Sequence, residues 1–314
     1  MRGTSNTLGI LCVLAGLALF SVQDLILKLL SGSYPLHQAM VFRSLTAAPL
    51  MLAIVWRYDG SPRSLLTPGW PRMLARGLLN FIAYGSFYLG LAALPLATTV
   101  ALYFTAPLMI TILSVLVLRE TVSLPRWIAV LAGFGGVIIL VRPGDALFDW
   151  AALLPVVSGF AYGLSMIYAR TLGRTETAAA MAFWGNLAFL GFALALSVIF
   201  GSGRFDGQSH ASLAFMMRGW VWPSGQDLAL MCGCGVIAAF GLTLLTQGYR
   251  IAKSSTVAPF EYSLLFWGLL WGWLIWGDWP DGTGWLGISV IIGAGLFVLH
   301  RETTEAKLNP HGSA

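Results

Sequence analysis

The chain of 314 residues is 57% hydrophobic, and only 10% of its residues are charged. An ordinary soluble domain carries about 25% charged residues, so the composition excludes that class. The net charge of +5 does not indicate a nucleic-acid-binding protein, because the basic residues lie in short loops between apolar runs and form no continuous stripe.

The first apolar run extends from Leu8 to Leu30 and carries Asp24 and Lys28 in its second half. A signal peptide would have a shorter apolar stretch that ends at a small-residue cleavage site, and this run has no such site. We therefore expect a retained first transmembrane helix.

Glycine, proline and clusters of charge divide the rest of the chain into further apolar runs. A helix needs about 20 apolar residues to cross a hydrocarbon core of about 30 Å. The sequence therefore predicts an all-α integral membrane protein with ten transmembrane helices. These helices are expected at 8–30, 36–56, 73–94, 96–118, 126–141, 149–170, 178–200, 227–249, 255–277 and 284–300.

The basic residues predict the orientation of these helices, because cytoplasmic loops are enriched in Lys and Arg. With the N-terminus in the cytoplasm, only Arg142, Arg204 and Arg218 of the 18 basic residues fall on the outer side. Lys28 and Arg43 lie at membrane depth, and the others are cytoplasmic. We therefore expect both termini to be cytoplasmic in a multi-pass protein of the bacterial inner membrane.

The segment from 201 to 226 is much longer than the other predicted loops. Trp220 and Trp222 lie beside Arg218 in it, a composition typical of a piece that lies at the membrane interface. We expect an extended outer loop here, and not an eleventh transmembrane helix.

The cysteines give no indication of a metal site. Cys12, Cys232 and Cys234 all lie in apolar stretches, and no cluster of Cys and His has the spacing of metal ligands. We expect them to be small buried side chains, and we expect no cofactor.

The two halves of the chain show an internal repeat. Residues 99–103 align with residues 256–260, and the two runs end at Glu120 and Asp278 respectively. Further pairs follow in the same order, namely Trp127 with Trp285 and Gly135 with Gly293. Five helices per half is an odd number, so the second copy enters the membrane from the opposite side, as in many transporters. We expect the repeats to be 1–142 and 143–314.

Several short motifs carry a resemblance to a known family. They are Asp24 with Lys28, Arg43, Ala106-Pro107-Leu108 before Leu118-Arg119-Glu120, and Ala258-Pro259-Phe260-Glu261-Tyr262 before Trp276-Gly277-Asp278. With them the chain resembles the EamA family of the drug/metabolite transporter superfamily over nearly its whole length. The resemblance implies two inverted five-helix repeats, a central cavity lined mainly by helices 1–4 and 6–9, and alternating access. Asp278 stands where the family usually has Glu.

Four ionisable residues lie at membrane depth, where each costs at least about 2.5–3.5 kcal/mol unless it faces a cavity or a partner. They are Asp24, Lys28, Arg43 and Glu261. Asp24 and Lys28 share a helix face, so they either form an ion pair within the helix or face a substrate. Arg43 either extends to the interface or joins a network with Asp24, and each role would serve an outer gate.

Glu261 is the strongest candidate for coupling transport to protons. It has no basic neighbour in its own helix, and it follows Pro259, which lacks a backbone donor and frees a carbonyl group one turn earlier. Burial without a fixed cation favours the neutral acid, which can exchange its proton for a cationic solute. The alternative is a neutral acid hydrogen-bonded to Asn80 or Tyr84 in the third helix.

Pro107 occupies nearly the repeat-related position in the fourth helix, one turn after Tyr103. Paired breaks of this kind in the two halves indicate a transport site. Aromatic side chains near these breaks can stack on a planar or cationic solute, although each can also serve packing alone. The candidates are Tyr103, Tyr84, Tyr162, Trp184 and Trp267.

The leading functional hypothesis is a secondary carrier for a small amphipathic metabolite that is cationic or zwitterionic. Asp24 and Glu261 would face its cation, and Arg43 or Lys28 would face an anionic group. The family resemblance implies amino acids or S-adenosylmethionine-like nucleoside metabolites as substrates. The chain has no ATP-binding signature, so the energy would come from a gradient, with the proton as a candidate coupling ion, or from exchange.

Other functions remain open at this stage. One is an exporter of hydrophobic amino acids or drug-like cations, and another is a structural or receptor-like membrane subunit. An intramembrane enzyme is disfavoured because no His is predicted opposite a Ser or Cys at mid-membrane. The expected partners are a small-molecule substrate and membrane lipid, with no nucleic acid, and the protein would be a monomer or a homodimer.

Overall fold

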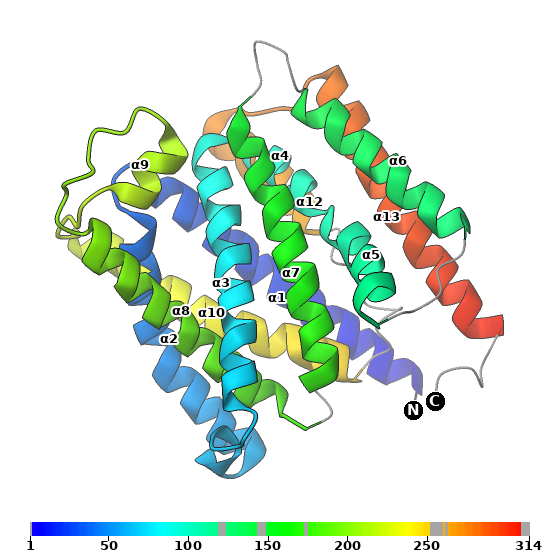
Figure 1. Ribbon diagram of the computed structural model, residues 1–314, viewed down its shortest axis with the longest axis horizontal. Coiled ribbons are helices and arrows are strands. Elements are labelled where there is room, and N and C mark those ends of the chain that lie inside the picture. Colours follow the sequence, from blue (N-terminus) through cyan, green and yellow to red (C-terminus); the bar gives the residue numbers. More distant parts are fainter. Residues whose placement is uncertain are drawn as a thin grey trace.

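A computed structural model of the chain describes residues 2–118, 124–142, 149–172, 175–251, 260 and 263–308 (Figure 1). Its regular structure in these ranges is entirely helical. The first half contains α1 (Arg2–Leu30), α2 (Leu36–Asp59), α3 (Trp70–Ala93), α4 (Leu96–Tyr103), α5 (Ala106–Leu118) and α6 (Leu124–Val141). The second half contains α7 (Leu153–Leu172), α8 (Ala178–Phe200), α9 (Ala211–Met217), α10 (Gly225–Ile251), α12 (Ser263–Trp271) and α13 (Gly282–Leu308).

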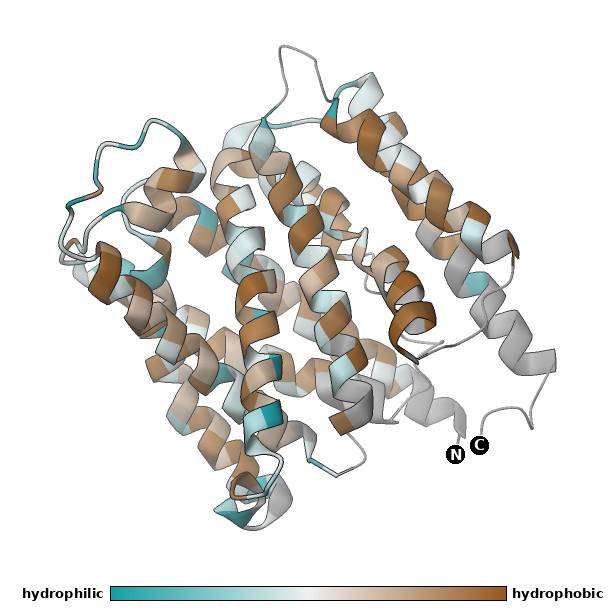
Figure 2. Ribbon diagram, viewed as in Figure 1, coloured by the Kyte–Doolittle hydropathy of each residue, from teal (hydrophilic) through white to brown (hydrophobic). Residues whose placement is uncertain are grey.

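The helices carry apolar side chains on their outer faces (Figure 2). Val198 is 84% exposed, Leu116 71% and Leu131 69%, which would be unfavourable in water but suits a lipid environment. Within the described residues, four helical stretches are long and apolar enough to cross a membrane, namely 7–30, 36–58, 179–200 and 225–245. Shorter apolar helices lie at 127–141, 150–165, 263–276 and 282–294. The chain is a helical membrane protein.

The helix predicted at 96–118 is divided in two. α4 ends at Tyr103, and α5 begins at Ala106 after a turn in which the Thr105 amide donates to the Leu102 carbonyl at 3.1 Å. Pro107 is the second residue of α5, where its missing N–H does not remove a helical hydrogen bond. The break therefore follows from the proline, as the sequence predicts.

Glycine permits close contacts between α6 and α13 and between α7 and the turn after α4. A Cβ atom at Gly287 of α13 would lie 3.0 Å from the Gly136 carbonyl of α6, and one at Gly136 would lie 3.0 Å from the Gly287 carbonyl. A Cβ atom at Gly159 of α7 would lie 2.9 Å from the Thr105 hydroxyl. Such close approaches are typical of helix pairs in membranes. Gly159 thus holds α7 against the break between α4 and α5.

The predicted outer loop contains one short helix, α9, and is fixed to the start of α2. The Gln38 side chain donates to the Val221 carbonyl at 2.7 Å and accepts from the Val221 amide at 3.3 Å. The Trp220 indole donates to His37 Nδ1 at 3.1 Å. Arg218 donates to the Ser31 carbonyl at 3.0 Å. The 201–226 segment therefore packs on the junction between α1 and α2.

The helices pair in a regular pattern. α1 packs extensively along α10, α3 along α7, α6 along α13 and α2 along α8, and α2 and α3 also contact α10 and α8 respectively. Figure 1 shows α6 and α13 side by side at one edge of the molecule. The members of each extensive pair come from opposite halves of the sequence, so the interior is built from both halves.

Candidate functional site

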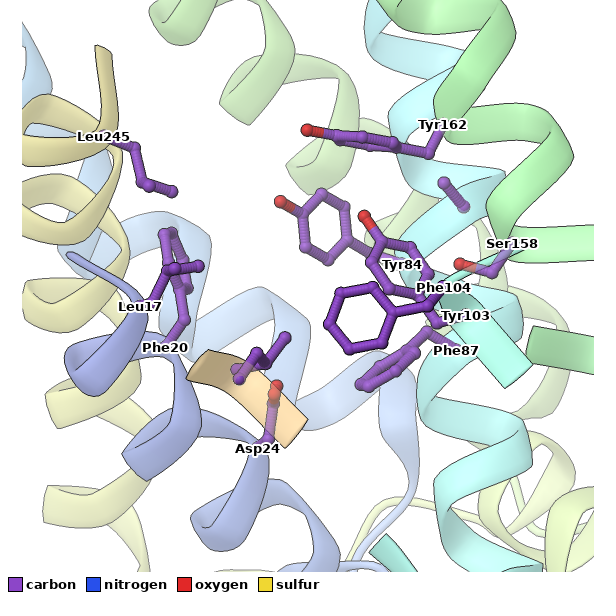
Figure 3. A pocket seen from close by; sticks show the side chains of 12 residues that line it. Leu17, Phe20, Asp24, Tyr84, Phe87, Tyr103, Phe104, Ser158, Tyr162 and Leu245 are labelled. Atoms are coloured by element: carbon purple, nitrogen blue, oxygen red, sulfur yellow. The ribbon is translucent and has the colours of Figure 1, made fainter. Parts of the chain in front are cut away.

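A cavity lies between α1, α3, α4, α7, α10 and α12 (Figure 3). Its empty volume is about 700 Å³, the open space at its mouth included. Ligand sites are lined mainly by apolar and aromatic side chains with a few polar groups, and the lining of this central cavity has that composition. α2 and α8 do not contribute to its lining in the described residues, although the family resemblance implied a role for helices 2 and 7.

Aromatic side chains make up half of the described residues that line the cavity. They are Phe20, Tyr84, Phe87, Tyr103, Phe104 and Tyr162. The Tyr103 ring meets Phe87 edge-on at 5.5 Å and lies tilted against Tyr162 at 5.7 Å between ring centroids. One side of the wall is therefore a set of packed rings from α3, α4 and α7, and Figure 3 shows Phe20 of α1 on the opposite side. A cavity of this kind suits a flat apolar ring.

Helical spacing explains why these residues meet. Leu17, Phe20 and Asp24 follow one another at intervals of three and four residues, so they share one face of α1. Ser158 and Tyr162 share one face of α7 for the same reason. Figure 3 shows these two faces on opposite sides of the cavity.

Asp24 is the carboxylate in the cavity lining as the structure describes it, and it belongs to a buried polar network. Its carboxyl group accepts a hydrogen bond from Tyr88 and interacts electrostatically with Arg43. Gln23 connects Tyr88 with Arg43. Its Nε2 donates to the Tyr88 hydroxyl at 2.5 Å, and its Oε1 accepts from Arg43 Nε at 3.1 Å. All four residues are buried. Arg43 thus compensates the charge of Asp24, as one of its two predicted roles required.

Lys28 has other partners. Its ammonium group donates to the carbonyls of Leu91 at 2.9 Å and Leu94 at 2.6 Å, and it lies 5.2 Å from the centroid of the Trp276 ring. These carbonyls belong to the end of α3, where a helix leaves acceptors without partners. Lys28 therefore caps α3. The structure does not form the in-helix pair of Asp24 with Lys28 that the sequence left as an alternative.

Comparison with known proteins extends this description. Residues 7–142 match the EamA-like transporter family. A riboflavin transporter of Rhizobium johnstonii is 33% identical over 231 residues, which cover 74% of this chain and 70% of the relative. A riboflavin transporter of Vibrio cholerae is 30% identical over 250 residues, which cover 79% of this chain and 78% of the relative.

The chain belongs to the EamA-like transporter family. This membership makes it a transporter and not an enzyme, as the sequence predicted, and places it among multi-pass membrane proteins with bacterial relatives.

More distant similarities cover nearly the whole EamA-like chain. An S-adenosylmethionine uptake transporter of Rickettsia prowazekii is 25% identical over 295 residues, which cover 94% of this chain and 93% of the relative. A solved crystal structure with 17% sequence identity superimposes with a TM-score of 0.62 and covers 96% of this chain and 99% of its own. The structural match shows a shared fold.

Three of the predicted aromatic residues line the cavity of this transporter, and two do not. Tyr84, Tyr103 and Tyr162 form part of its wall. Trp184 instead stacks on Trp70 at 5.5 Å, and its indole donates to the Leu65 carbonyl at 3.0 Å. Trp267 stacks on Trp271 at 6.0 Å. Spacing along the sequence did not distinguish these roles, because tryptophan packs well at helix contacts and at helix ends.

Asn80 lies near the cavity in a polar contact between α3 and α7. Its Oδ1 accepts from the Ser165 hydroxyl at 2.6 Å, and Arg76, one turn earlier, donates from Nε to the Ser165 carbonyl at 3.3 Å. Arg76 also interacts electrostatically with Tyr84 and Tyr162 of the cavity wall. The sequence assigned Arg76 only to the cytoplasmic flank. Its spacing of four residues from Asn80 and eight from Tyr84 was the available signal for a second role.

Other predicted site residues fall outside what the structure describes. Glu261 and Pro259 lie outside the described residues, and for Pro107 only the backbone is described. Sequence reasoning missed eight of the described cavity residues, namely Leu17, Phe20, Ala83, Phe87, Phe104, Ser158, Leu245 and Leu264. Apolar and hydroxyl side chains are common in every membrane helix, so their identity gave no signal. Within the described residues, no group of His, Cys, Asp and Glu has the arrangement of a metal site.

Proposed function

We propose that this protein is a secondary active transporter that carries a small metabolite with a flat ring across the bacterial inner membrane by alternating access. The observation that carries the proposal is the central cavity, whose lining among the described residues contains six aromatic side chains and one carboxylate. Flat aromatic surfaces favour a planar solute, and a few polar groups fix its orientation. The sequence contains no ATP-binding signature, so a gradient or exchange would supply the energy.

We infer that the chain forms ten transmembrane helices in two inverted repeats, 1–142 and 143–314. The contact of α1 with α10 has a counterpart in that of α7 with α3, as the repeat requires. The contact of α2 with α10 corresponds in the same way to that of α8 with α3. The start of α1 and the end of α13 lie at the same end of the molecule in Figure 1, which supports an even number of crossings.

The cavity is suitably placed for alternating access. α1, α3 and α4 from the first half and α7, α10 and α12 from the second half contribute to its lining. These are repeat-related sets, since α1 corresponds to α7, α3 to α10 and α4 to the region around α12. Rocking of one half against the other would therefore expose the same cavity to either side of the membrane.

The charge balance favours a substrate with little net charge. Asp24 is the carboxylate among the described lining residues, and Arg43 already compensates it. A substrate with a flat ring and an uncharged polar chain would fill the cavity without breaking this pair. Two relatives are named as riboflavin transporters, and riboflavin has this form, with a tricyclic ring and a hydroxylated chain. We therefore propose a riboflavin-like substrate first.

The second candidate is a cationic or zwitterionic metabolite such as an amino acid or S-adenosylmethionine, the substrate in the name of the Rickettsia relatives. Asp24 favours it, because a carboxylate surrounded by aromatic rings is a suitable environment for a cation. Such a substrate would compete with Arg43 for the Asp24 carboxylate. Glu261, if it faces the cavity, would supply a second negative group.

Counterflow in proteoliposomes tests these candidates. Vesicles containing the purified protein are loaded with unlabelled riboflavin, S-adenosylmethionine, leucine or a lipophilic cation, and uptake of the labelled compound is measured. A true substrate stimulates uptake of its own label from the opposite side. We expect riboflavin to do so. Stimulation by leucine or the lipophilic cation alone would contradict the ring-binding site and favour the exporter alternative.

A pair of variants links transport to the cavity. Tyr103→Leu removes a ring from the cavity wall, and we expect it to reduce counterflow about tenfold or more, because stacking on an aromatic ring contributes on the order of 1–3 kcal/mol. Tyr58→Leu is the matched control, since Tyr58 is exposed on α2 and does not line the cavity. Equal losses in both variants would contradict the assignment of the cavity.

Glu261 remains our candidate for proton coupling. Glu261→Gln keeps the size of the side chain but cannot release a proton, so we expect it to abolish or uncouple transport while the protein still folds and inserts. Uptake driven by an imposed pH gradient is the measurement. Full proton-driven uptake in this variant would remove Glu261 from the coupling mechanism and leave the ring-binding proposal intact.

A further inference from the structure

Ser158 presents a buried hydroxyl group to the central cavity. The residue is only 1% exposed, and its Oγ has no hydrogen-bond partner among the residues that the structure describes. Figure 3 shows the hydroxyl directed from α7 toward the interior of the cavity, near Tyr103 and Phe104. A buried hydroxyl without a partner destabilises a fold, so its presence here requires a reason.

Several hydroxyl side chains in other helices of this protein are satisfied locally. Ser197 donates to the Ala193 carbonyl and Thr243 to the Ala239 carbonyl, both at 2.7 Å, and Thr46 donates to the Phe42 carbonyl at 2.9 Å. Each bond spans four residues, which is the usual solution for Ser and Thr within a helix. Ser158 does not adopt it, and its hydroxyl is held at the α4–α5 break by the close approach of the adjacent Gly159 to Thr105.

Position distinguishes Ser158 from the other buried polar groups without partners. Within the described chain, these other atoms are Ser44 Oγ, Asn186 Oδ1 and Ser263 Oγ. Ser44 lies at the contact of α2 with α8, where Asn186 donates to its carbonyl at 3.0 Å, and none of the three lines the cavity. Ser158 alone in this set is placed to meet a bound solute.

We propose that the Ser158 hydroxyl hydrogen-bonds a nitrogen or oxygen atom on the edge of the substrate ring, and so selects heteroaromatic rings with a polar edge over hydrocarbon rings. This inference rests on the proposed function. The aromatic wall holds the faces of a flat ring, and the edge that reaches α7 meets the hydroxyl. A site with such a polar group discriminates strongly against ligands that leave it unpaired.

The proposal predicts opposite effects on stability and on binding. Ser158→Ala removes the hydroxyl that lacks a partner, so the ligand-free protein should unfold about 2 °C higher or more. The same variant should bind riboflavin about tenfold more weakly, the change expected for one neutral hydrogen bond. A serine with a purely structural role would not give this combination.

The experiment measures thermal unfolding of the purified protein in detergent across a riboflavin titration, for the wild type, Ser158→Ala and Ser44→Ala. Ser44→Ala is the matched control, because Ser44 is equally buried and also lacks a partner for its hydroxyl within the described residues. We expect Ser44→Ala to raise the melting temperature of the ligand-free protein without changing the dissociation constant for riboflavin.

A third variant separates the lost hydrogen bond from lost packing. Ser158→Cys keeps the size of the side chain but hydrogen-bonds weakly. The proposal requires it to bind riboflavin about as weakly as Ser158→Ala does. Wild-type affinity in either variant would overturn the role of Ser158 and leave the proposed function standing. If the wild type binds neither riboflavin nor S-adenosylmethionine, the proposed function fails and this inference fails with it.

Discussion

Two groups of polar side chains connect helices that surround the cavity. Asp24, Gln23, Tyr88 and Arg43 form one group at the level where α1, α2 and α3 meet. Arg76, Asn80 and Ser165 form the other group between α3 and α7. Each arginine donates a hydrogen bond to another group inside the protein, Arg43 to Gln23 and Arg76 to the Ser165 carbonyl, and this reduces the cost of burying its charge. The cavity between the groups can therefore remain mostly apolar.

Removal of Arg43 should leave a buried carboxylate without compensation. We expect Arg43→Ala to destabilise the protein by about 3 kcal/mol or more, because Asp24 would lose its cationic partner in an apolar interior and would either stay charged without compensation or take up a proton. The double variant Asp24→Asn with Arg43→Ala should recover part of this loss, since an amide can still accept from Tyr88. Reversible unfolding in detergent and denaturant is the measurement. Strictly additive losses in the two single variants would show that the residues do not interact.

Arg57→Ala is the control for this experiment. Arg57 lies on the same helix as Arg43 but is exposed, with its guanidinium 5.9 Å from the centroid of the Tyr58 ring. Exposed cation–π contacts contribute about 0.5–1 kcal/mol, so only a small change is expected.

For single residues, the sequence identifies the charged members of the buried networks well and the uncharged members poorly. Asp24 and Arg43 were identifiable because a charge at membrane depth is costly and rare. Gln23, Tyr88 and Ser158 were not, because single polar side chains occur in many membrane helices, and only the packing of α1 on α3 and of α7 on α4 gives them a role. Lys28 was found but its partner was not, since the end of α3 is far away in the sequence.

At the scale of elements, proline and glycine control where helices break and where they touch. Pro107 explains the division of 96–118 into α4 and α5, and this break brings Tyr103 and Phe104 to the cavity. The repeat did not identify the glycine of α13 that acts in a close contact. Gly287 faces Gly136 at a helix contact, whereas Gly293, which the repeat singled out, faces open space.

This difference between two glycines of α13 gives a prediction. Gly287→Ala should destabilise the protein, because its Cβ atom would lie 3.0 Å from the Gly136 carbonyl and force α6 and α13 apart. Gly293→Ala should be neutral or stabilise by about 0.4–1 kcal/mol, because its Cβ atom would meet nothing and alanine favours the helix. Thermal unfolding of the two variants in one detergent compares them. Equal stabilities would show that the α6–α13 contact is not tight.

Two consecutive residues at the start of α2, His37 and Gln38, form hydrogen bonds that hold the 201–226 segment. Gln38→Met keeps the size of the side chain but removes both hydrogen bonds to Val221. We expect amide hydrogen exchange in 218–224 to accelerate, because the segment would open locally more often. Gln208→Met is the control, since Gln208 is exposed within the same segment. Unchanged exchange in Gln38→Met would show that the other contacts of the segment, such as those of Trp220 with His37 and of Arg218 with Ser31, hold it without Gln38.

At the scale of the whole molecule, the sequence predicts which segments are helices, but not which helices meet. Hydropathy and breakers place most of the helices to within a few residues, as with 178–200 against α8. The pairing of α1 with α10 and of α3 with α7 is a property of the folded chain. It brings Asp24 and Ser158 to opposite sides of one cavity, although the two are more than a hundred residues apart. The internal repeat is the part of this arrangement that the sequence does indicate.

The orientation of the whole molecule in the membrane can be tested with single cysteines in a background without Cys12, Cys232 and Cys234. Ser209→Cys lies in the 201–226 segment, and Ser61→Cys lies between α2 and α3. If the basic residues orient the chain as we expect, a membrane-impermeant maleimide should label Ser209→Cys in intact cells. It should label Ser61→Cys only after the inner membrane is permeabilised. Labelling of both positions in intact cells, or the reverse order, would contradict the predicted even number of helices with cytoplasmic termini, and with it the proposed inverted relation of the two halves.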